Sequence, residues 1–242
     1  MSKPSVNIVW FKRDLRTRDH AALAAARHAG LPVIALYVFE PALLALPEYD
    51  VRHGRFIRQC LDDLAQHQPL LVFYDGMLPV LEKIKQHFDI KTLFSHQETG
   101  QLATFERDKA VGRWCKQNGV GWQEFEQDGV HRARRDRIGW NKAVLRHLEA
   151  PLENSVPLPL PDLSSTGWDT WPAGVADGAV LPPEILEDHP DFQPGGEHNA
   201  WRYLHSFGAE RAQHYSRHIS KPLESRRSCS RLSPYLAWGC LS

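Results

Sequence analysis

The chain has 242 residues, of which 42% are apolar and 24% charged, proportions that are ordinary for a globular protein. Twenty-nine basic residues balance 29 acidic ones, so any contact with nucleic acid has to come from a local basic patch. No apolar run approaches the roughly 18 residues of a membrane span, and the N-terminus lacks signal-peptide architecture. The four cysteines have no metal-site spacing. We therefore expect a cytoplasmic protein with reduced thiols, no membrane segment and no metal site.

The first 125 residues alternate between apolar, strand-like segments and helix-like segments. Strands are predicted at residues 6–11, 31–40, 69–76, 91–96 and 120–125. Helices are predicted from an N-cap at Asp19 to a stop at Gly30, and at 52–66, 77–87 and 103–118. Strands that are apolar nearly throughout and separated by helices imply a parallel sheet covered on both faces. The predicted fold is α/β: a Rossmann-like, doubly wound five-stranded parallel sheet, then a long linker and the start of an all-α domain.

Polar loops follow two of these strands, where open α/β sheets form their ligand crevice. The loop FKRDLRTRDH, residues 11–20, has no glycine-rich dinucleotide fingerprint, and a charge network that pins the loop is favoured over direct ligand contact. In SHQETG, residues 95–100, Gln97 and Glu98 could hydrogen-bond a heterocycle, and a plain polar loop is equally supported. The basic run HRARRDR, residues 131–137, could touch a polyanion, although a solvated loop is favoured.

The composition changes at residue 151. Residues 151–196 are rich in proline, glycine, serine and aspartate, which predicts a long connector over the surface of the first domain. A helical stripe resumes at Glu197 with Trp201, Leu204 and Phe207. We expect three parts: an α/β domain at 1–135, an extension and linker at 136–196, and the beginning of a helical domain at 197–242.

The last residues, SRLSPYLAWGCLS at 230–242, combine a capping signal with hydroxyl groups. Ser233 before Pro234 is a favoured N-cap and N1 pair. With Ser230 and Arg231 beside it, such a helix start could hold a phosphate. On physical grounds alone an ordinary capped helix is favoured.

Three stretches together resemble the DNA photolyase/cryptochrome family. One of them, YSRHISKPLESRRSCSRLS at residues 215–233, resembles the family's approach to its flavin site: a tyrosine, a loop, then a hydroxyl-rich turn. WFKRDLRTRDH, residues 10–20, resembles the family motif W-F-R-x-D-L-R-x-x-D-N, with His20 where asparagine is usual. SRLSPYLAWGCLS resembles the flavin-site motif S-R-L-S-P-Y-L-x-x-G-x-L-S. The resemblance implies an N-terminal α/β domain that can hold a light-harvesting antenna, a long linker, and a helical domain that holds FAD.

The resemblance also implies which residues contact the flavin. Tyr215 and the S-R-L-S segment match flavin-contacting positions; Cys229, where the family often has threonine, is a weaker match because a thiol is a poorer donor. The predicted FAD-binding residues are Tyr215, Cys229, Ser230, Arg231, Leu232 and Ser233. No catalytic residue is assigned. Glu98 lies near the loop where some members bind a folate-type antenna, but HQETG is not a close match, so an antenna of unknown identity is expected.

The function implied by the resemblance is blue-light-dependent repair of DNA by a deoxyribodipyrimidine photo-lyase, in which reduced FAD passes an electron to a flipped-out pyrimidine dimer. The expected partner is damaged DNA, bound mainly by the helical domain of a protein that is monomeric when full length. Since most of that domain would need further residues, we expect a truncated chain with an incomplete FAD site and no activity of its own. The alternatives are a cryptochrome-type photoreceptor without repair activity and a stand-alone chromophore- or nucleotide-binding α/β module.

Overall fold

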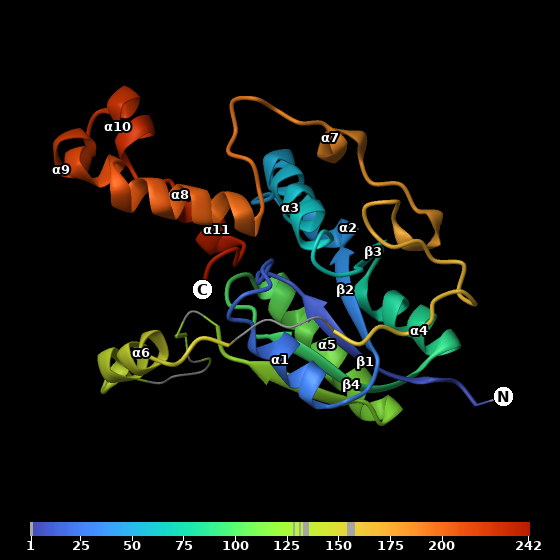
Figure 1. Ribbon diagram of the computed structural model, residues 1–242. Helices are drawn as coiled ribbons and strands as arrows, with labels where there is room; N and C mark the ends of the chain where they lie inside the picture. Colours follow the sequence, from blue (N-terminus) through green and yellow to red (C-terminus); the bar gives the residue numbers. More distant parts are fainter. Residues whose placement is uncertain (1, 128, 131, 133–135, 154–157) are drawn as a thin grey trace.

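The computed structural model describes residues 2–127, 129–130, 132, 136–153 and 158–242. Within these residues the centre is a sheet of five parallel strands in the order β3-β2-β1-β4-β5 (Figure 1). The strands are β1 (Ser5–Phe11), β2 (Val33–Phe39), β3 (Leu71–Tyr74), β4 (Asp89–His96) and β5 (Gly121–Phe125). Because β1 lies in the middle and the chain winds outward to both edges, the predicted doubly wound α/β fold is confirmed.

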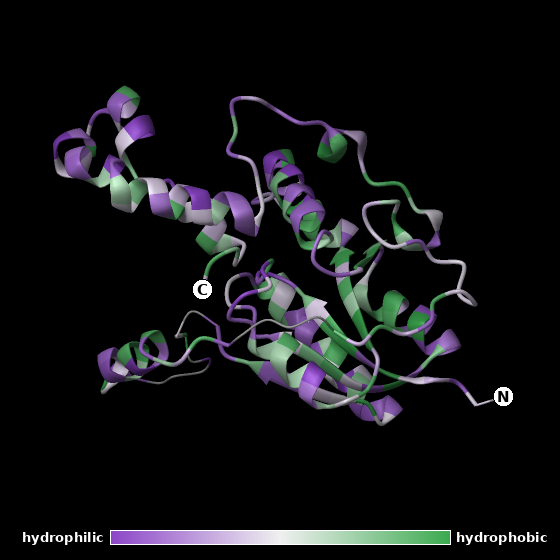
Figure 2. Ribbon diagram, in the orientation of Figure 1, coloured by the Kyte–Doolittle hydropathy of each residue, from purple (hydrophilic) through white to green (hydrophobic). Residues whose placement is uncertain are grey.

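Side chains that alternate along the strands supply two apolar clusters, one on each face of the sheet. The helices that cover these faces are α1 (Ala21–His28), α2 (Pro41–Leu44), α3 (Val51–Leu64), α4 (Met77–His87) and α5 (Leu102–Asn118). Val9 and Phe11 pack on the side of α1 and α3, while Ile8 and Trp10 pack on the side of α4 and α5. A strand buried on both sides has to be apolar throughout, as Figure 2 shows for the central strands.

The start of α1 differs from the prediction. His20, not Asp19, is the N-cap: its Nδ1 accepts a hydrogen bond from the N–H of Leu23 at 3.1 Å. Asp19 instead has a φ of 50°, and its carboxylate accepts from the N–H of Glu153 at 3.1 Å. The prediction of Asp19 as the cap is wrong because its carboxylate binds the backbone of the connector instead of the first turn of α1. The predicted stop at Gly30 is confirmed, with a φ of 73°.

The connector lies against the α/β domain, as predicted (Figure 1). Its short elements, with the helix before it, are α6 (Trp140–Leu148), η1 (Ala176–Gly178) and α7 (Pro183–Leu186). The backbone N–H of Trp171 donates to the Leu70 carbonyl at 2.8 Å, and its indole N–H donates to Asp62 at 2.9 Å. Leu181 and Ile185 are buried. The connector therefore completes the core of the first domain, while the three domain boundaries stay a prediction.

The C-terminal part forms an arm that projects from the α/β domain and then returns to it (Figure 1). Its elements are α8 (Glu197–Ala209), η2 (Arg211–His214), α9 (Tyr215–His218), α10 (Pro222–Ser228) and α11 (Ser233–Ala237). After α11, Cys240 and Leu241 are buried, and within α11 the ring of Tyr235 is buried too. In the described portion of the chain, no helix combines the length and apolar character that crossing a bilayer requires.

Candidate functional site

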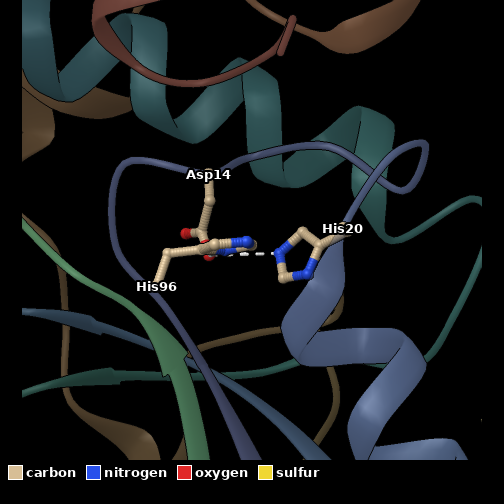
Figure 3. A group of neighbouring side chains, drawn as sticks. All are labelled: Asp14, His20 and His96. Atoms are coloured by element: carbon tan, nitrogen blue, oxygen red, sulfur yellow. Dashed lines mark hydrogen bonds and ion pairs between the residues drawn. The ribbon is translucent and has the colours of Figure 1, made fainter. Parts of the chain in front are cut away.

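The loop after β1 is organised around the buried carboxylate of Asp14 (Figure 3). One oxygen accepts from the backbone N–H of Lys12 at 2.6 Å. The other lies 2.7 Å from Nδ1 of His96 and 3.1 Å from Nε2 of His20. These contacts join the loop to the end of β4 and to the start of α1. They pin the loop against these two elements, the role that the sequence favoured for its charged residues over direct ligand contact.

The protonation of this cluster follows from its hydrogen bonds. Because Nδ1 of His20 accepts from Leu23, the proton of the neutral ring lies on Nε2 and points at Asp14. Burial, with His96 close by, lowers the pKa of His20 to about 4. Burial alone would raise the pKa of Asp14, but hydrogen bonds from both imidazoles outweigh it and hold that pKa well below its usual range. The cluster is thus an aspartate anion that lies against two imidazole rings, of which His20 is neutral.

These three side chains also resemble a metal-ligand set, since their ligand atoms lie within 4.8 Å of one another. A metal ion on Nε2 of His20 would have to replace the only proton of that ring, because Nδ1 already accepts from Leu23. The hydrogen bonds account for the arrangement of Asp14, His20 and His96 without an ion.

A pocket lies at the carboxyl edge of the sheet, between the α/β domain and the segment after α11. Its cavity volume is about 200 Å³. Six aromatic rings line it: Trp10, Phe11, Tyr37, Phe39, Tyr49 and Trp238. A pocket lined by aromatic rings suits a flat, largely apolar ligand. We call it the edge pocket.

The charged side chains of the edge pocket are largely paired. Arg107 contacts Glu40 at 2.7 Å and Glu98 at 2.5 Å, and Arg13 contacts Glu98 at 3.3 Å. Burial lowers the pKa of Lys12 and raises the pKa of Glu40. The edge pocket therefore offers hydrogen-bonding groups beside aromatic surface, the combination that binds the edge of a planar heterocycle. Glu98, singled out from the sequence, is one of these groups.

The segment after α11 docks directly on the loop after β1. The N–H of Leu15 donates to the Trp238 carbonyl at 3.1 Å, and Nη1 of Arg16 donates to the Gly239 carbonyl at 3.0 Å. The guanidinium of Arg13 lies 4.8 Å from the ring centre of Trp238. The two sequence motifs, more than 200 residues apart, are therefore in contact. Trp238 belongs to one motif and lines the edge pocket beside the other.

Gly239 explains how closely these motifs approach. It has a φ of 64°, and a Cβ atom there would lie 2.0 Å from the carbonyl oxygen of Arg13. The contact buries Leu241, which is only 7% exposed. Leu236, on α11 before the docked residues, remains 50% exposed.

The predicted flavin-contacting segment, residues 229–233, is a tight turn between α10 and α11. Arg231 has a φ of 59°, in the left-handed region, and Leu232 is right-handed with φ −85° and ψ −13°. The carbonyls of Cys229 and Ser230 accept from the guanidinium of Arg211, the second at 3.2 Å. Among the described residues, the N–H groups of 230–233 donate to no partner. A left-handed residue followed by a right-handed one turns successive N–H groups toward one concave side, a common anion-binding geometry.

The prediction of Ser233 as an N-cap is wrong. Leu232 occupies the cap position, no side chain caps α11, and Ser233 is its first residue. The left-handed Arg231 starts the turn one residue earlier than the sequence pattern suggests. The hydroxyl of Ser233 is consequently left without a hydrogen bond among the described residues.

Tyr215 is not brought against this turn. Its ring packs edge-on to Phe207 with centroids 6.0 Å apart, and it is 38% exposed. No hydrogen bond or ring contact joins Tyr215 to residues 229–233 within the portion of the chain that the structure describes. Cys229, Ser230, Arg231, Leu232 and Ser233 form one turn, and Tyr215 lies on the arm before it.

The basic run at 131–137 lies partly outside the described residues, which include only Arg132 and 136–137 of it. Arg132 forms ion pairs with Glu124 at 3.1 Å and with Asp108 at 3.2 Å, so its positive charge is neutralised within the α/β domain. Contact of this run with a polyanion stays a prediction. Sequence reasoning did not single out Arg211, because its contacts join residues 18 and 19 positions apart in the chain.

Comparisons with known proteins agree with the motifs. The family model described as DNA photolyase matches residues 7–138. Deoxyribodipyrimidine photo-lyase of Vibrio cholerae is 25% identical over 98% of this chain and 53% of its own length. Cryptochrome-1 of Sinapis alba is 27% identical over 100% of this chain and 51% of its own length. The chain spans about half the length of the curated relatives it matches.

Among solved structures, a Synechocystis cryptochrome superimposes with a TM-score of 0.73 and 21% identity, covering 100% of this chain and 54% of that one. At this identity the likeness shows the fold alone. The family match covers more than half of the chain and includes the motif of the first strand. On this evidence, the chain belongs to the DNA photolyase/cryptochrome family.

Proposed function

We propose that this chain belongs to a blue-light-dependent DNA repair flavoprotein of the deoxyribodipyrimidine photo-lyase type, whose partner is damaged DNA. Light-excited reduced FAD supplies an electron that splits a pyrimidine dimer, so the hard chemistry is the cofactor's. We assign no catalytic residue in this chain. The proposal includes the three domains at 1–135, 136–196 and 197–242, a monomeric state and a cytoplasmic location. The four unpaired cysteines support that location.

The turn at 229–233 fits the diphosphate of FAD. Its unpaired N–H groups and the hydroxyls of Ser230 and Ser233 are donors, and the guanidinium of Arg211 holds the carbonyls on the opposite side. We propose that these residues hold the diphosphate. Tyr215, exposed on the arm, would contribute a further contact to the flavin.

The edge pocket fits an antenna chromophore. It combines aromatic rings with paired charges, and Trp238 forms part of its wall. A chromophore there would lie beside the segment that follows the flavin turn. The identity of this chromophore is left open by the pocket chemistry, which would accept several planar heterocycles.

The observation that most supports this proposal is the contact between the two motifs. The segment that follows the candidate flavin turn hydrogen-bonds to the loop after β1, beside the candidate antenna pocket. The test is to incubate the flavoprotein to which this chain is proposed to belong with reduced FAD and an oligonucleotide that contains a cyclobutane dimer, and to measure dimer loss under blue light and in the dark. The proposal predicts loss of the dimer under blue light and no loss in the dark. Bound FAD that is photoreduced without dimer loss would favour the cryptochrome alternative, which the similarity to Cryptochrome-1 supports. A chromophore in the edge pocket without FAD binding would favour the stand-alone module.

A further inference from the structure

A side chain of the connector supports the left-handed conformation of Arg231. Nε2 of Gln193 donates to the Arg231 carbonyl at 2.8 Å, and Oε1 of Gln193 accepts from Nε of Arg231 at 3.1 Å. Both polar atoms of the Gln193 side-chain amide therefore hydrogen-bond to Arg231. Non-glycine residues seldom adopt a φ near 59° unless their surroundings impose it.

Gln193 is itself firmly placed. The hydroxyl of Tyr235 donates to the carbonyl of the next residue, Pro194, at 2.7 Å. The N–H of Gly195 donates to Gln59 on α3 at 2.8 Å. A Cβ atom on Gly195 would lie 2.3 Å from the Phe56 carbonyl, so the backbone here lies directly on α3. The amide of Gln193 is thus presented from the α/β domain, not from the arm that carries the turn.

The direction of the Arg231 carbonyl sets the direction of the next N–H. In a trans peptide, the carbonyl of one residue and the N–H of the following residue point in opposite directions. Because Gln193 binds the Arg231 carbonyl, the N–H of Leu232 points away from the connector. Arg211 does the same for the preceding peptide, by binding the Ser230 carbonyl.

We infer that Gln193 is a positioning residue for phosphate binding: its amide holds Arg231 left-handed, so that the N–H groups of the turn converge on a diphosphate. This inference rests on the proposed function. It adds a residue outside both motifs, whose part in binding is exerted through Arg231, by one hydrogen bond to its carbonyl and one to its side chain.

The experiment is a double-mutant cycle between Gln193→Met and Arg231→Gly, with ADP and FAD as probes in titration calorimetry. Methionine keeps the length of the side chain and removes both hydrogen bonds. Glycine adopts the left-handed conformation without support. In the native background, Q193M is expected to weaken ADP binding roughly tenfold, the scale set by loss of a left-handed residue. In the R231G background, the same change should weaken ADP binding by less than about twofold.

The control is Gln66→Met, which changes an exposed glutamine on the surface near α3. This variant should bind ADP as tightly as the native chain does.

The outcomes separate the two proposals. If the native chain binds ADP and FAD but Q193M binds equally well, the positioning role is refuted and the proposed function stands. Equal losses from Q193M in both backgrounds would also refute the positioning role, because they would show an effect that does not act through Arg231. A folded native chain that binds neither probe would refute flavin binding at this turn, and the role of Gln193 with it. Circular dichroism of every variant checks that it is folded.

Discussion

Replacing His20 with asparagine should flatten the dependence of stability on pH. His20 is fully buried and its pKa is lowered from 6.5 to about 4, mainly by burial. The folded protein keeps the ring neutral, whereas the unfolded chain takes up a proton as the pH falls below about 6.5. Stability is therefore lost between about pH 6.5 and pH 4. The difference in pKa corresponds to about 3 kcal/mol in total and to about 2 kcal/mol between pH 7 and pH 5.

Asparagine is a suitable replacement because it does not titrate in this range and its Oδ1 can still cap α1 through the N–H of Leu23. The assay is urea unfolding of the native chain and His20→Asn at about pH 7 and pH 5. The variant should lose about 2 kcal/mol less than the native chain over this interval. Asp14 does not interfere, since its depressed pKa affects stability only at lower pH. His28→Asn, an exposed position on the same helix, is the matched control. Equal pH dependence of H20N and the native chain would refute the reasoning.

Two further predictions concern the docked C-terminal segment. Gly239→Ala should destabilise the chain by about 2 kcal/mol or more, because the added Cβ meets the Arg13 carbonyl in a left-handed conformation; thermal unfolding measures this. Gly174→Ala, where a Cβ meets nothing within 4 Å, should change stability by no more than about 0.5 kcal/mol, and an equal effect of both would count against the docking contact. Tyr235→Phe removes the hydrogen bond to the Pro194 carbonyl and should cost about 1–2 kcal/mol in urea unfolding; an unchanged midpoint would show that this bond does not hold the segment.

The sheet was predictable because its central strands are almost wholly apolar and buried on both faces. Runs such as residues 31–40 leave little alternative to a buried parallel strand. The start of α1 was not predictable from local pattern. Aspartate is a more common N-cap residue than histidine, but the carboxylate of Asp19 accepts a hydrogen bond from the N–H of Glu153, which is distant in sequence. His20 caps the helix through Nδ1 while its Nε2 lies 3.1 Å from Asp14, a contact between residues six positions apart.

The candidate site divides in the same way. Residues 229–233 were recognisable from a contiguous motif, and the structure gathers them into one turn. Gln193 and Arg211 could not be found that way, since their side chains act on carbonyls 18 to 38 residues away in the sequence. The burial of Leu241 likewise depends on the backbone approach of Gly239 to the first loop.

The central claim is that the turn at 229–233 holds FAD. Titration of the purified chain with FAD, followed by flavin fluorescence, tests it most directly. The account predicts saturable binding that weakens in Ser233→Ala, while Ser164→Ala, an exposed serine on the connector, leaves it unchanged. A folded chain that leaves the flavin signal unaltered, or that binds FAD equally well without the Ser233 hydroxyl and with Arg231→Pro, would contradict it.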